Sequence, residues 1–395
     1  MRKNNIINLL GFQEKLVKKV ERSENYINIY LETKKSLHLC PSCGYSTKHV
    51  HDYKKQKIQH VNIGKTPSFL ILNKRRYACN HCGKRFYESY DFIQRYFRKS
   101  NEVYENVIAD LKCLKNYTNI AKDNHVSIPT VVRYSKYFTF LSCKNVIYHL
   151  PKRIGIDEFK GNCNRTKYQV HIFDLDTGKT IDIVESRKYD DLEKYFSKFE
   201  KRNSVELVTM DLYSPFKRVI KDKFINAKIV ADRFHYTRIV MKSLDELRLN
   251  LWRNTKGIEK KYFKYLKLSL MKKSSNAKDY DAEKLLYAFE LSPILKEAYK
   301  LKEQFLNIKD LTSYEEQEKA FRKWIYDADC STIKEFKSAV KTLRQWHEYI
   351  SNSFKYNISN GPVEGKNNLI KVLKRISFGF RNLDNFRIRI LMCEL

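Results

Sequence analysis

Two pairs of cysteines constrain the fold of the N-terminal third of this chain most strongly. The pairs are CPSCG, with Cys40 and Cys43, and CNHCG, with Cys79 and Cys82, and 35 residues separate them. A CxxC turn followed by glycine directs two thiolates to one point, and two such turns complete a closed tetrahedral zinc site. The residues between the pairs include strand-like runs at 61–79, so we expect a zinc ribbon that holds one structural Zn²⁺. A redox-active cysteine pair is the alternative.

The charge of the chain limits its partners. Its 395 residues include 77 Lys or Arg and 45 Asp or Glu, a net charge of +32, while 42% are hydrophobic. A chain of this length can form several domains, and its charge favours a polyanionic partner, with nucleic acid ahead of an anionic membrane. Residues 36–99 carry 13 Lys or Arg against 3 Asp or Glu, so the ribbon is also a candidate phosphate-contacting surface. A solvated basic face around a purely structural zinc is the alternative.

The hydropathy pattern argues against a membrane protein. No run of about 18 apolar residues is present, and the apolar stretch in MRKNNIINLLGF is too short for a secretory signal. We therefore expect a soluble, intracellular protein without a membrane partner. The excess of Lys, Asn, Ile and Tyr is typical of AT-rich coding, which indicates a bacterial source, and we expect the protein in the cytoplasm.

Residues 101–138 show helical periodicity interrupted by short turns. Val103, Val107 and Leu111 recur at helical spacing, a second helix begins near Ile120, and a third begins near Pro129. This pattern is typical of a helix-turn-helix, and a packed helical hairpin is the alternative. The third helix would present three side chains to a DNA groove, which are Thr130, Arg133 and Lys136.

From residue 151 onward, strand patterns alternate with helices. Three strands are expected within residues 152–186, followed by a helix and then strands near residues 205–212 and 227–232. This order predicts a mixed sheet with right-handed crossovers. Asp157 and Asp211 would each lie at a strand end, and therefore side by side. A single aspartate at a strand end is more often a turn or cap residue.

The stretch SNGPVEGKNN at residues 359–368 carries Glu364, the only acidic residue between Glu348 and Asp384. A helix starting at Pro362 would place Glu364 on a basic face. That face also carries Asn368, Lys371 and Arg375, which are expected to contact DNA. The opposite, core-facing stripe is expected to contain Leu369, Val372, Leu373 and Ile376. An acid in a first helical turn stabilises a helix by about 0.3–1 kcal/mol, but that effect does not explain the basic face around it.

Two aspartates and a glutamate provide the hard oxygen ligands that a pair of Mg²⁺ or Mn²⁺ ions requires. Basic residues beside them would hold the phosphates that the acids would otherwise repel. The combination indicates phosphodiester chemistry with two divalent metal ions.

The motifs CPxCG, CxxCGKRF, GIDEF, MD, ADRFH and SNGPVEGKNNLIKVLKRISFGFRN occur in this order. Together with the helix-turn-helix, they resemble the bacterial insertion-sequence transposases of the ISL3 family over residues 38–391. The resemblance implies a DDE enzyme with a ribonuclease-H-like catalytic domain and identifies Asp157, Asp211 and Glu364 as its catalytic, metal-binding triad. Asp232 and His235 match ADRFH and are possible accessory residues, although Asp232 is equally well explained as a helix N-cap.

The expected fold class is multidomain α+β: a zinc ribbon, a helix-turn-helix, and a ribonuclease-H-like α/β catalytic domain with a helical insertion. The insertion follows from the 153 positions between Asp211 and Glu364, which include strongly helical segments. Trp252, Trp324 and Trp346 either pack in a core or stack on an exposed base. The expected domains are an N-terminal segment (1–35), the zinc ribbon (36–97), the helix-turn-helix (98–145), the catalytic domain (150–240 and 356–395) and the helical insertion (241–355).

The expected function is that of a DNA transposase. It would bind the terminal inverted repeats of its insertion sequence, cleave phosphodiester bonds with two metal ions, and join the released 3′-hydroxyls to target DNA. Because two DNA ends must meet, a homodimer or higher oligomer is expected on double-stranded DNA, associated with the nucleoid when bound.

Two other functions remain open at this point. A catalytically inactive, transposase-derived DNA-binding protein or repressor would use the same zinc ribbon and helices. A tyrosine recombinase would use the HxxR pair formed by His235 and Arg238, but it would leave the three carboxylates without a role.

Overall fold

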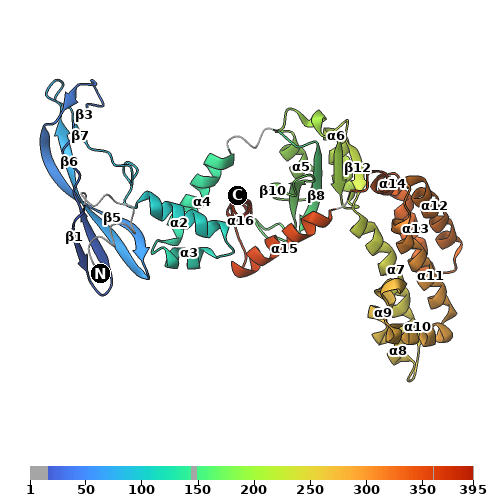
Figure 1. Ribbon diagram of the computed structural model, residues 1–395. Coiled ribbons are helices and arrows are strands. Elements are labelled where there is room, and N and C mark those ends of the chain that lie inside the picture. Colours follow the sequence, from blue (N-terminus) through green and yellow to red (C-terminus); the bar gives the residue numbers. More distant parts are fainter. Residues whose placement is uncertain (1–16, 144–148, 359, 395) are drawn as a thin grey trace. The chain divides into compact units, whose positions relative to one another are not determined.

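The computed structural model describes residues 17–143, 149–358 and 360–394. The chain divides into two compact units (Figure 1). The first unit comprises the chain up to residue 144 together with residues 373–379 and 384–395, and the second comprises residues 145–372 and 380–383.

The first unit begins with a sheet that contains the ribbon. Its strands are β1 (Val17–Arg22), β2 (Ile27–Leu31), β5 (Val50–Ile63), β6 (Thr66–Ala78) and β7 (Arg85–Tyr87), and β3 (His38–Leu39) pairs with β4 (Ser46–Thr47) in a small hairpin. The strand order is β1-β2-β6-β5, with β7 added to β6. Alternate residues of β2 and β6, such as Ile29 and Leu70, are buried in one core.

The strand pairing in this sheet corrects the expected boundary between an N-terminal segment (1–35) and the zinc ribbon (36–97). The strands β1 and β2 lie within the expected N-terminal segment, yet they belong to the same sheet as β5 and β6 because β2 pairs in parallel with β6. Residues 1–16 of that segment lie outside the described residues.

A group of helices follows the sheet in the first unit. They are α2 (Asn101–Lys112), α3 (Tyr117–Asp123), α4 (Ile128–Cys143) and, from the end of the chain, α16 (Leu383–Met392). Asn116 caps α3, since its side chain accepts a hydrogen bond from the Asn119 amide at 2.8 Å. The helices share a core that includes Val107, Leu111 and Ile120.

The C-terminal helix differs from the expected domain assignment. Residues 384–395 were assigned to the catalytic domain, but Ile388 and Met392 of α16 pack into the core of α2, α3 and α4. The buried guanidinium of Arg389 donates hydrogen bonds to the backbone carbonyls of Leu111, Cys113 and Lys115, which lie at and after the end of α2. These three bonds hold α16 to the turn between α2 and α3.

The second unit is built on a mixed five-stranded sheet. Its strands are β8 (Arg153–Phe159), β9 (Gln169–Asp174), β10 (Thr180–Val184), β11 (Leu207–Met210) and β12 (Lys228–Ala231). They lie in the order β10-β9-β8-β11-β12, antiparallel from β10 to β8 and parallel from β8 to β12. The central strands are buried along almost their whole length, as is usual for a sheet covered on both faces.

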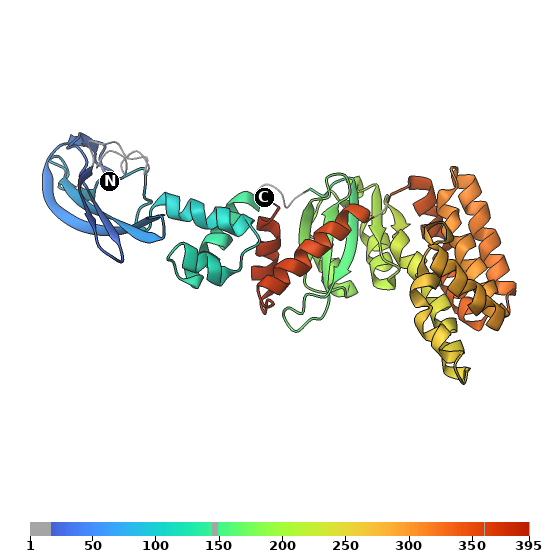
Figure 2. The ribbon, with the colours of Figure 1, turned by 60° about the horizontal axis from the view of Figure 1, so that its bottom comes forward.

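Helices from three parts of the chain surround this sheet. They are α5 (Tyr189–Phe196), α6 (Ser214–Lys223), α7 (Arg233–Asn254), α14 (His347–Tyr356) and α15 (Gly361–Ile376). Figure 2 shows α15 running alongside the sheet. Ile154 and Ile156 of β8 share the large core of the unit with Leu192 of α5 and Phe216 of α6.

The segment expected as a helical insertion consists of helices joined by short loops. Its further helices are α8 (Lys260–Tyr265), α9 (Lys267–Met271), α10 (Asp279–Leu291), α11 (Pro293–Asn307), α12 (Tyr314–Cys330) and α13 (Lys334–Gln345). Trp324 and Trp346 are buried in its core, and the Trp324 indole donates to the Leu301 carbonyl at 2.7 Å. The hypothesis that these two rings stack on DNA is therefore wrong. The third tryptophan, Trp252, is half-buried.

Within the part of the chain that the structure describes, no helix has the length and apolar character needed to cross a membrane.

Candidate functional site

Three aspartates lie near the carboxyl ends of neighbouring strands in the sheet of the second unit. Asp211 and Asp232 directly follow β11 and β12, whereas Asp157 lies within β8. The expectation that Asp157 ends its strand is therefore wrong, because β8 continues to Phe159 and keeps pairing with β9. Met210 of β11 lies opposite Ile156 of β8 on one side and Ala231 of β12 on the other. The next residues along the chain are Asp157, Asp211 and Asp232. The parallel register alone therefore brings the three carboxylates to the carboxyl end of the sheet, where α/β proteins usually bind ligands.

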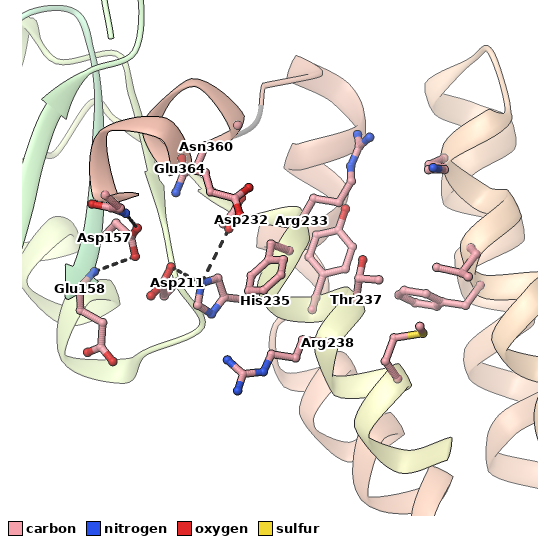
Figure 3. Close-up of a pocket in the computed structure, with 18 of the residues that line it drawn as sticks. Asp157, Glu158, Asp211, Asp232, Arg233, His235, Thr237, Arg238, Asn360 and Glu364 are labelled. Atoms are coloured by element: carbon pink, nitrogen blue, oxygen red, sulfur yellow. Dashed lines mark hydrogen bonds and ion pairs between the residues drawn. The ribbon is translucent and has the colours of Figure 1, made fainter. Parts of the chain in front are cut away.

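His235, in the first turn of α7, joins this group (Figure 3). Its Nε2 lies 2.9 Å from Oδ1 of Asp211 and 3.8 Å from Oδ2 of Asp232. Ligand atoms of Asp157, Asp211 and His235 all lie within 4.8 Å of one another. Of the two possible accessory residues, His235 thus belongs to the cluster, and Asp232 lies next to this histidine. The spacing of Asp157, Asp211 and His235 is compatible with a metal ion.

The carboxylate of Asp157 is held on both of its oxygens. The Glu158 amide donates to Oδ1 at 2.7 Å, and the side-chain amide of Asn367, on α15, donates to Oδ2. The other end of Asn367 is fixed in turn, since its Oδ1 lies 3.0 Å from Nδ1 of buried His171, whose Nε2 lies 2.9 Å from the Thr180 hydroxyl. The sequence pattern did not identify Asn367 or His171. The only signal was the helical spacing of Asn367 from Glu364.

Burial and mutual repulsion raise the pKa values of these acids. Burial, followed by the charge of Asp211, raises the pKa of Asp157 to about 7, although the Glu158 amide, His235 and Asn367 oppose the shift. Burial also raises the pKa values of Asp211 and Asp232. Burial by itself would lower the pKa of His235, but the hydrogen bond and charge of Asp211 and the charges of the other two aspartates outweigh this and raise it. The cluster therefore favours a bound cation.

Glu364 lines the same cavity but stands apart from this cluster. It lies in the first turn of α15 and is exposed, and it does not belong to the set of ligand atoms from Asp157, Asp211 and His235 that all lie within 4.8 Å of one another. The structure thus brings two of the three predicted acids together and places the third on the wall of their cavity. Repulsion between carboxylates favours this separation.

The buried stripe of α15 also differs from the expected one. Val363, Asn367, Ile370 and Leu373 are buried, whereas Val372 is exposed and Leu369 is half-buried. Asn367 takes a position in the buried stripe because it bonds to Asp157 and His171.

A cavity of about 910 Å³ opens beside the acids. At one end it is lined by the carboxylates of the cluster and Glu364. Its other wall is apolar and comes from the helical segment, with side chains of Met271, Phe305 and Ile308. Four cationic side chains also line it: Arg233, Arg238, Lys309 and Lys371. A cavity with acids at one end and cations around it can hold a metal-bound phosphate.

The four cysteines of the ribbon form a second cluster, in the first unit. Sγ of Cys40 lies 3.5 Å from that of Cys82, and Sγ of Cys43 lies 3.6 Å from that of Cys79. All four sulfurs lie within 4.8 Å of one another. Burial alone would raise the pKa of Cys40, but the amides of Ser42 and Cys43 outweigh it and lower the pKa to about 6. These features support a structural zinc site.

Both cysteine turns depend on glycine. Gly44 and Gly83 have φ values of 72° and 70°, and their amides donate to the carbonyls of Cys40 and Cys79 at 2.9 and 3.0 Å. Glycine adopts this left-handed conformation without steric cost, so each turn can direct its amides at a thiolate.

Most of the predicted DNA-contacting side chains are exposed. These are Arg133 and Lys136 on α4, and Asn368, Lys371 and Arg375 on α15. Thr130 is an exception, because it is buried near the start of α4 and its hydroxyl lies 3.0 Å from that of Ser127. The expectation that Thr130 faces a DNA groove is therefore wrong, and the residue stabilises the first turn of α4.

Comparison with known families identifies the chain. Residues 154–390 match the family model of the ISL3-type DDE transposases, described as a transposase. This match covers more than half of the chain. The chain belongs to the ISL3 family of transposases. Residues 36–82 match a second model, described as the zinc finger of the transposases of IS204, IS1001, IS1096 and IS1165.

Individual relatives agree with this family. The chain is 23% identical over 395 residues to the transposase for insertion sequence element IS1001 from Bordetella parapertussis, which covers 96% of this chain and 95% of that protein. It is 23% identical over 256 residues to the IS1557 transposase from Mycobacterium tuberculosis, covering 58% and 57% of the two chains. A segment of 104 residues is 33% identical to a Lactococcus lactis protein named ATP-dependent protease, but it covers only 26% of this chain.

Membership of the ISL3 family confirms the resemblance drawn from the sequence motifs. It supports a DNA transposase function, and it establishes a mixed α/β chain with a zinc-ribbon-type domain and a transposase domain.

Proposed function

We propose that this transposase cleaves phosphodiester bonds at the ends of its insertion sequence and joins the released 3′-hydroxyls to target DNA. The observation that carries the proposal is the register of β8, β11 and β12, which places Asp157 and Asp211 side by side at the edge of a cavity. We assign the sheet to a ribonuclease-H-like fold because β10, β9 and β8 are antiparallel to one another in turn, whereas β11 and β12 run parallel to β8.

The donor set fits two divalent ions, Mg²⁺ or Mn²⁺. Asp157 and Asp211 would hold the ions together with Glu364, the third acid on the cavity wall. The raised pKa values of the two aspartates support this assignment, because nearby positive charge would offset the cost of their burial and mutual repulsion. When bound, such ions activate the attacking water or 3′-hydroxyl and stabilise the leaving oxygen.

The protein groups around the acids have separate tasks. Asn367 holds the Asp157 carboxylate in one orientation, and His171 holds Asn367. His235 holds Asp211, which also gives this histidine a role outside the HxxR pair of a tyrosine recombinase. Glu364 is exposed, so its side chain can turn toward the aspartates once positive charge is present. The cations on the cavity wall would bind the phosphates on either side of the cleaved bond.

The first unit would recognise the DNA ends. We assign α2, α3 and α4 to a helix-turn-helix whose reading helix is α4, with Arg133 and Lys136 exposed on it. The zinc ribbon would add phosphate contacts through its basic strands, and Asn368, Lys371 and Arg375 would contact DNA from α15. Because two ends must be joined, the working complex would be a dimer or larger assembly on DNA.

The direct test uses purified protein and labelled element-end DNA with Mg²⁺ or Mn²⁺. Wild type should make a metal-dependent cut that leaves a 3′-hydroxyl. Asp211→Asn should lose cleavage while binding the same DNA nearly as well, and the exposed Asp279→Asn should retain cleavage. Cutting by Asp211→Asn at the wild-type rate would remove Asp211 from the site. Tight binding without any cleavage by wild type would support a transposase-derived repressor, and a covalent protein–DNA adduct would support a tyrosine recombinase.

A further inference from the structure

The turn that ends α15 carries an aromatic ring that its own unit does not use. Phe378 is 94% exposed. Its backbone φ is 55°, in the left-handed region that L-residues rarely adopt. The ring thus gains no free energy from burial, while the backbone conformation at the same residue is unfavourable.

The hydrogen bonds of this turn show that Phe378 occupies a backbone position that is unusual for phenylalanine. The Gly379 amide donates to the Lys374 carbonyl at 2.9 Å, and the Phe378 amide donates to the Arg375 carbonyl at 3.1 Å. This pair of bonds defines a Schellman motif in which Phe378 occupies the left-handed position, normally taken by glycine. Glycine is the next residue in this chain, at position 379, and not at the position that favours it.

The surroundings of the ring are basic. Arg375 is exposed in the last turn of α15, with Lys374 beside it, and the chain contains no acidic residue between Glu364 and Asp384. The cores of protein interfaces are depleted of charged residues, and they bury aromatic rings in apolar patches. A single apolar ring among cations is instead the pattern of a side chain inserted between the base steps of DNA.

The turn is attached to the helices proposed to bind DNA. The Asn116 side chain, which caps α3, donates to the Ile376 carbonyl at the end of α15 at 3.2 Å. Beyond the turn, α16 is held by Arg389 to the carbonyls that follow α2. Phe378 therefore projects from the same group of helices that carries Arg133 and Lys136.

We propose that Phe378 inserts into double-stranded DNA as an apolar wedge, with Arg375 binding the adjacent phosphate. This inference rests on the proposed DNA-binding function and adds a specific contact to it. It also explains why phenylalanine occupies a position where glycine would be more stable.

Phe378→Gly tests this proposal because it separates stability from binding. The variant should melt at a higher temperature than wild type, since glycine adopts the left-handed conformation of this position without steric strain. Its affinity for element-end DNA should nevertheless fall about tenfold, in the range expected for the loss of one aromatic contact with a base. The dependence of affinity on salt should remain unchanged, whereas Arg375→Ala should reduce the salt slope by about one phosphate contact. The matched control is Tyr326→Ala on α12, a ring that is 67% exposed and outside the proposed sites.

Insertion itself can be measured by fluorescence. Phe378→Trp should keep wild-type affinity, and the emission of its added indole should be quenched by DNA through stacking on bases. Tyr326→Trp should show no added quenching. Unchanged DNA affinity of Phe378→Gly, or an unquenched indole at 378, would overturn the wedge. So would a loss of self-association in Phe378→Gly with DNA affinity retained, which would identify a second copy as the partner. If wild type bound no DNA, the proposed function would fail, and the wedge with it.

Discussion

The positions and the pKa values of Asp157 and Asp211 depend on the strands and charges around them. Asp157 lies within β8 and Asp211 directly follows β11, and the parallel register of these strands places the two residues next to each other at a cavity. Burial, followed by repulsion from neighbouring carboxylates, raises the pKa values of both residues, so both bind protons more tightly than in the unfolded chain. The arrangement is unfavourable without a cation, which is the property expected of a metal site.

This electrostatic strain predicts a pH dependence of stability in the metal-free protein. The pKa of Asp157 is raised from 3.8 to about 7, so between these values the folded state holds a proton that the unfolded state has released. The free energy of unfolding should therefore fall as pH rises through this window. The raised pKa of His235 acts in the same direction, since its stabilising charge is lost as pH rises through the folded pKa.

Thermal melts of the metal-free protein from pH 5 to pH 8 measure this effect. The melting temperature should drop less in Asp157→Asn than in wild type, while the exposed Asp279→Asn should follow wild type. Added Mg²⁺ or Mn²⁺ should stabilise wild type more at pH 8 than at pH 5. Equal pH slopes for wild type and Asp157→Asn would contradict the assignment.

Asn367 is predicted to position Asp157 without touching DNA. Asn367→Ala removes the donor to one carboxylate oxygen, and loss of such a supporting contact typically lowers metal affinity or activity by about 10–100-fold. A titration of cleavage rate against Mn²⁺ should show a shift to higher metal concentration. Asn368→Ala, the neighbouring exposed residue, should weaken DNA binding and leave the metal dependence unchanged. The same metal dependence in Asn367→Ala and wild type would remove Asn367 from this role.

Sequence patterns predicted some of these residues and not others, for physical reasons. Asp157 and Asp211 could be found because each directly follows a run of hydrophobic strand residues, although the pattern ended β8 at Asp157 and the strand continues to Phe159. Asn367 was not, because a buried amide is recognised only by partners that are far away in the sequence, such as Asp157 and His171. Thr130 was assigned to a groove from helical periodicity, which does not reveal the bond that its hydroxyl makes to Ser127.

Among the helices, α16 shows that hydrophobic periodicity does not reveal which core a helix joins. The pattern of FRIRILM at residues 386–392 indicates a helix with an apolar face, but not which core that face joins. The deciding contacts are the three carbonyl bonds of Arg389, made to residues more than 270 positions away. The strands β1 and β2 were missed for a related reason, since only their pairing with β6 assigns them to the sheet.

Arg389 is predicted to stabilise the first unit. Arg389→Met keeps much of the apolar volume but leaves three carbonyls without their donor, so the free energy of unfolding should fall by about 1–3 kcal/mol. Chemical denaturation followed by a probe in the first unit measures the change. Arg381→Ala, at an exposed arginine, should have little effect. Wild-type stability of Arg389→Met would show that packing of Ile388 and Met392 alone holds α16.

At the scale of the whole molecule, charge is the dominant feature. A net charge of +32 is spread over both units, including the basic strands of the ribbon and the basic face of α15. DNA binding should therefore be driven largely by release of counterions. Affinity for element-end DNA should fall by roughly a thousandfold between 50 and 200 mM salt if about six phosphates are contacted. Fluorescence anisotropy over this range measures the slope, and a nearly flat slope would contradict a phosphate-dominated interface.

If Asp211 binds a catalytic metal ion, a change of its ligand atom should change which metal ion supports cleavage. Asp211→Cys replaces a hard oxygen ligand with a softer thiolate, which binds Mn²⁺ better than Mg²⁺. The variant should bind element-end DNA like wild type, fail to cleave it with Mg²⁺, and recover cleavage with Mn²⁺. Cleavage by Asp211→Cys with Mg²⁺ at the wild-type rate would show that Asp211 does not hold the metal ion.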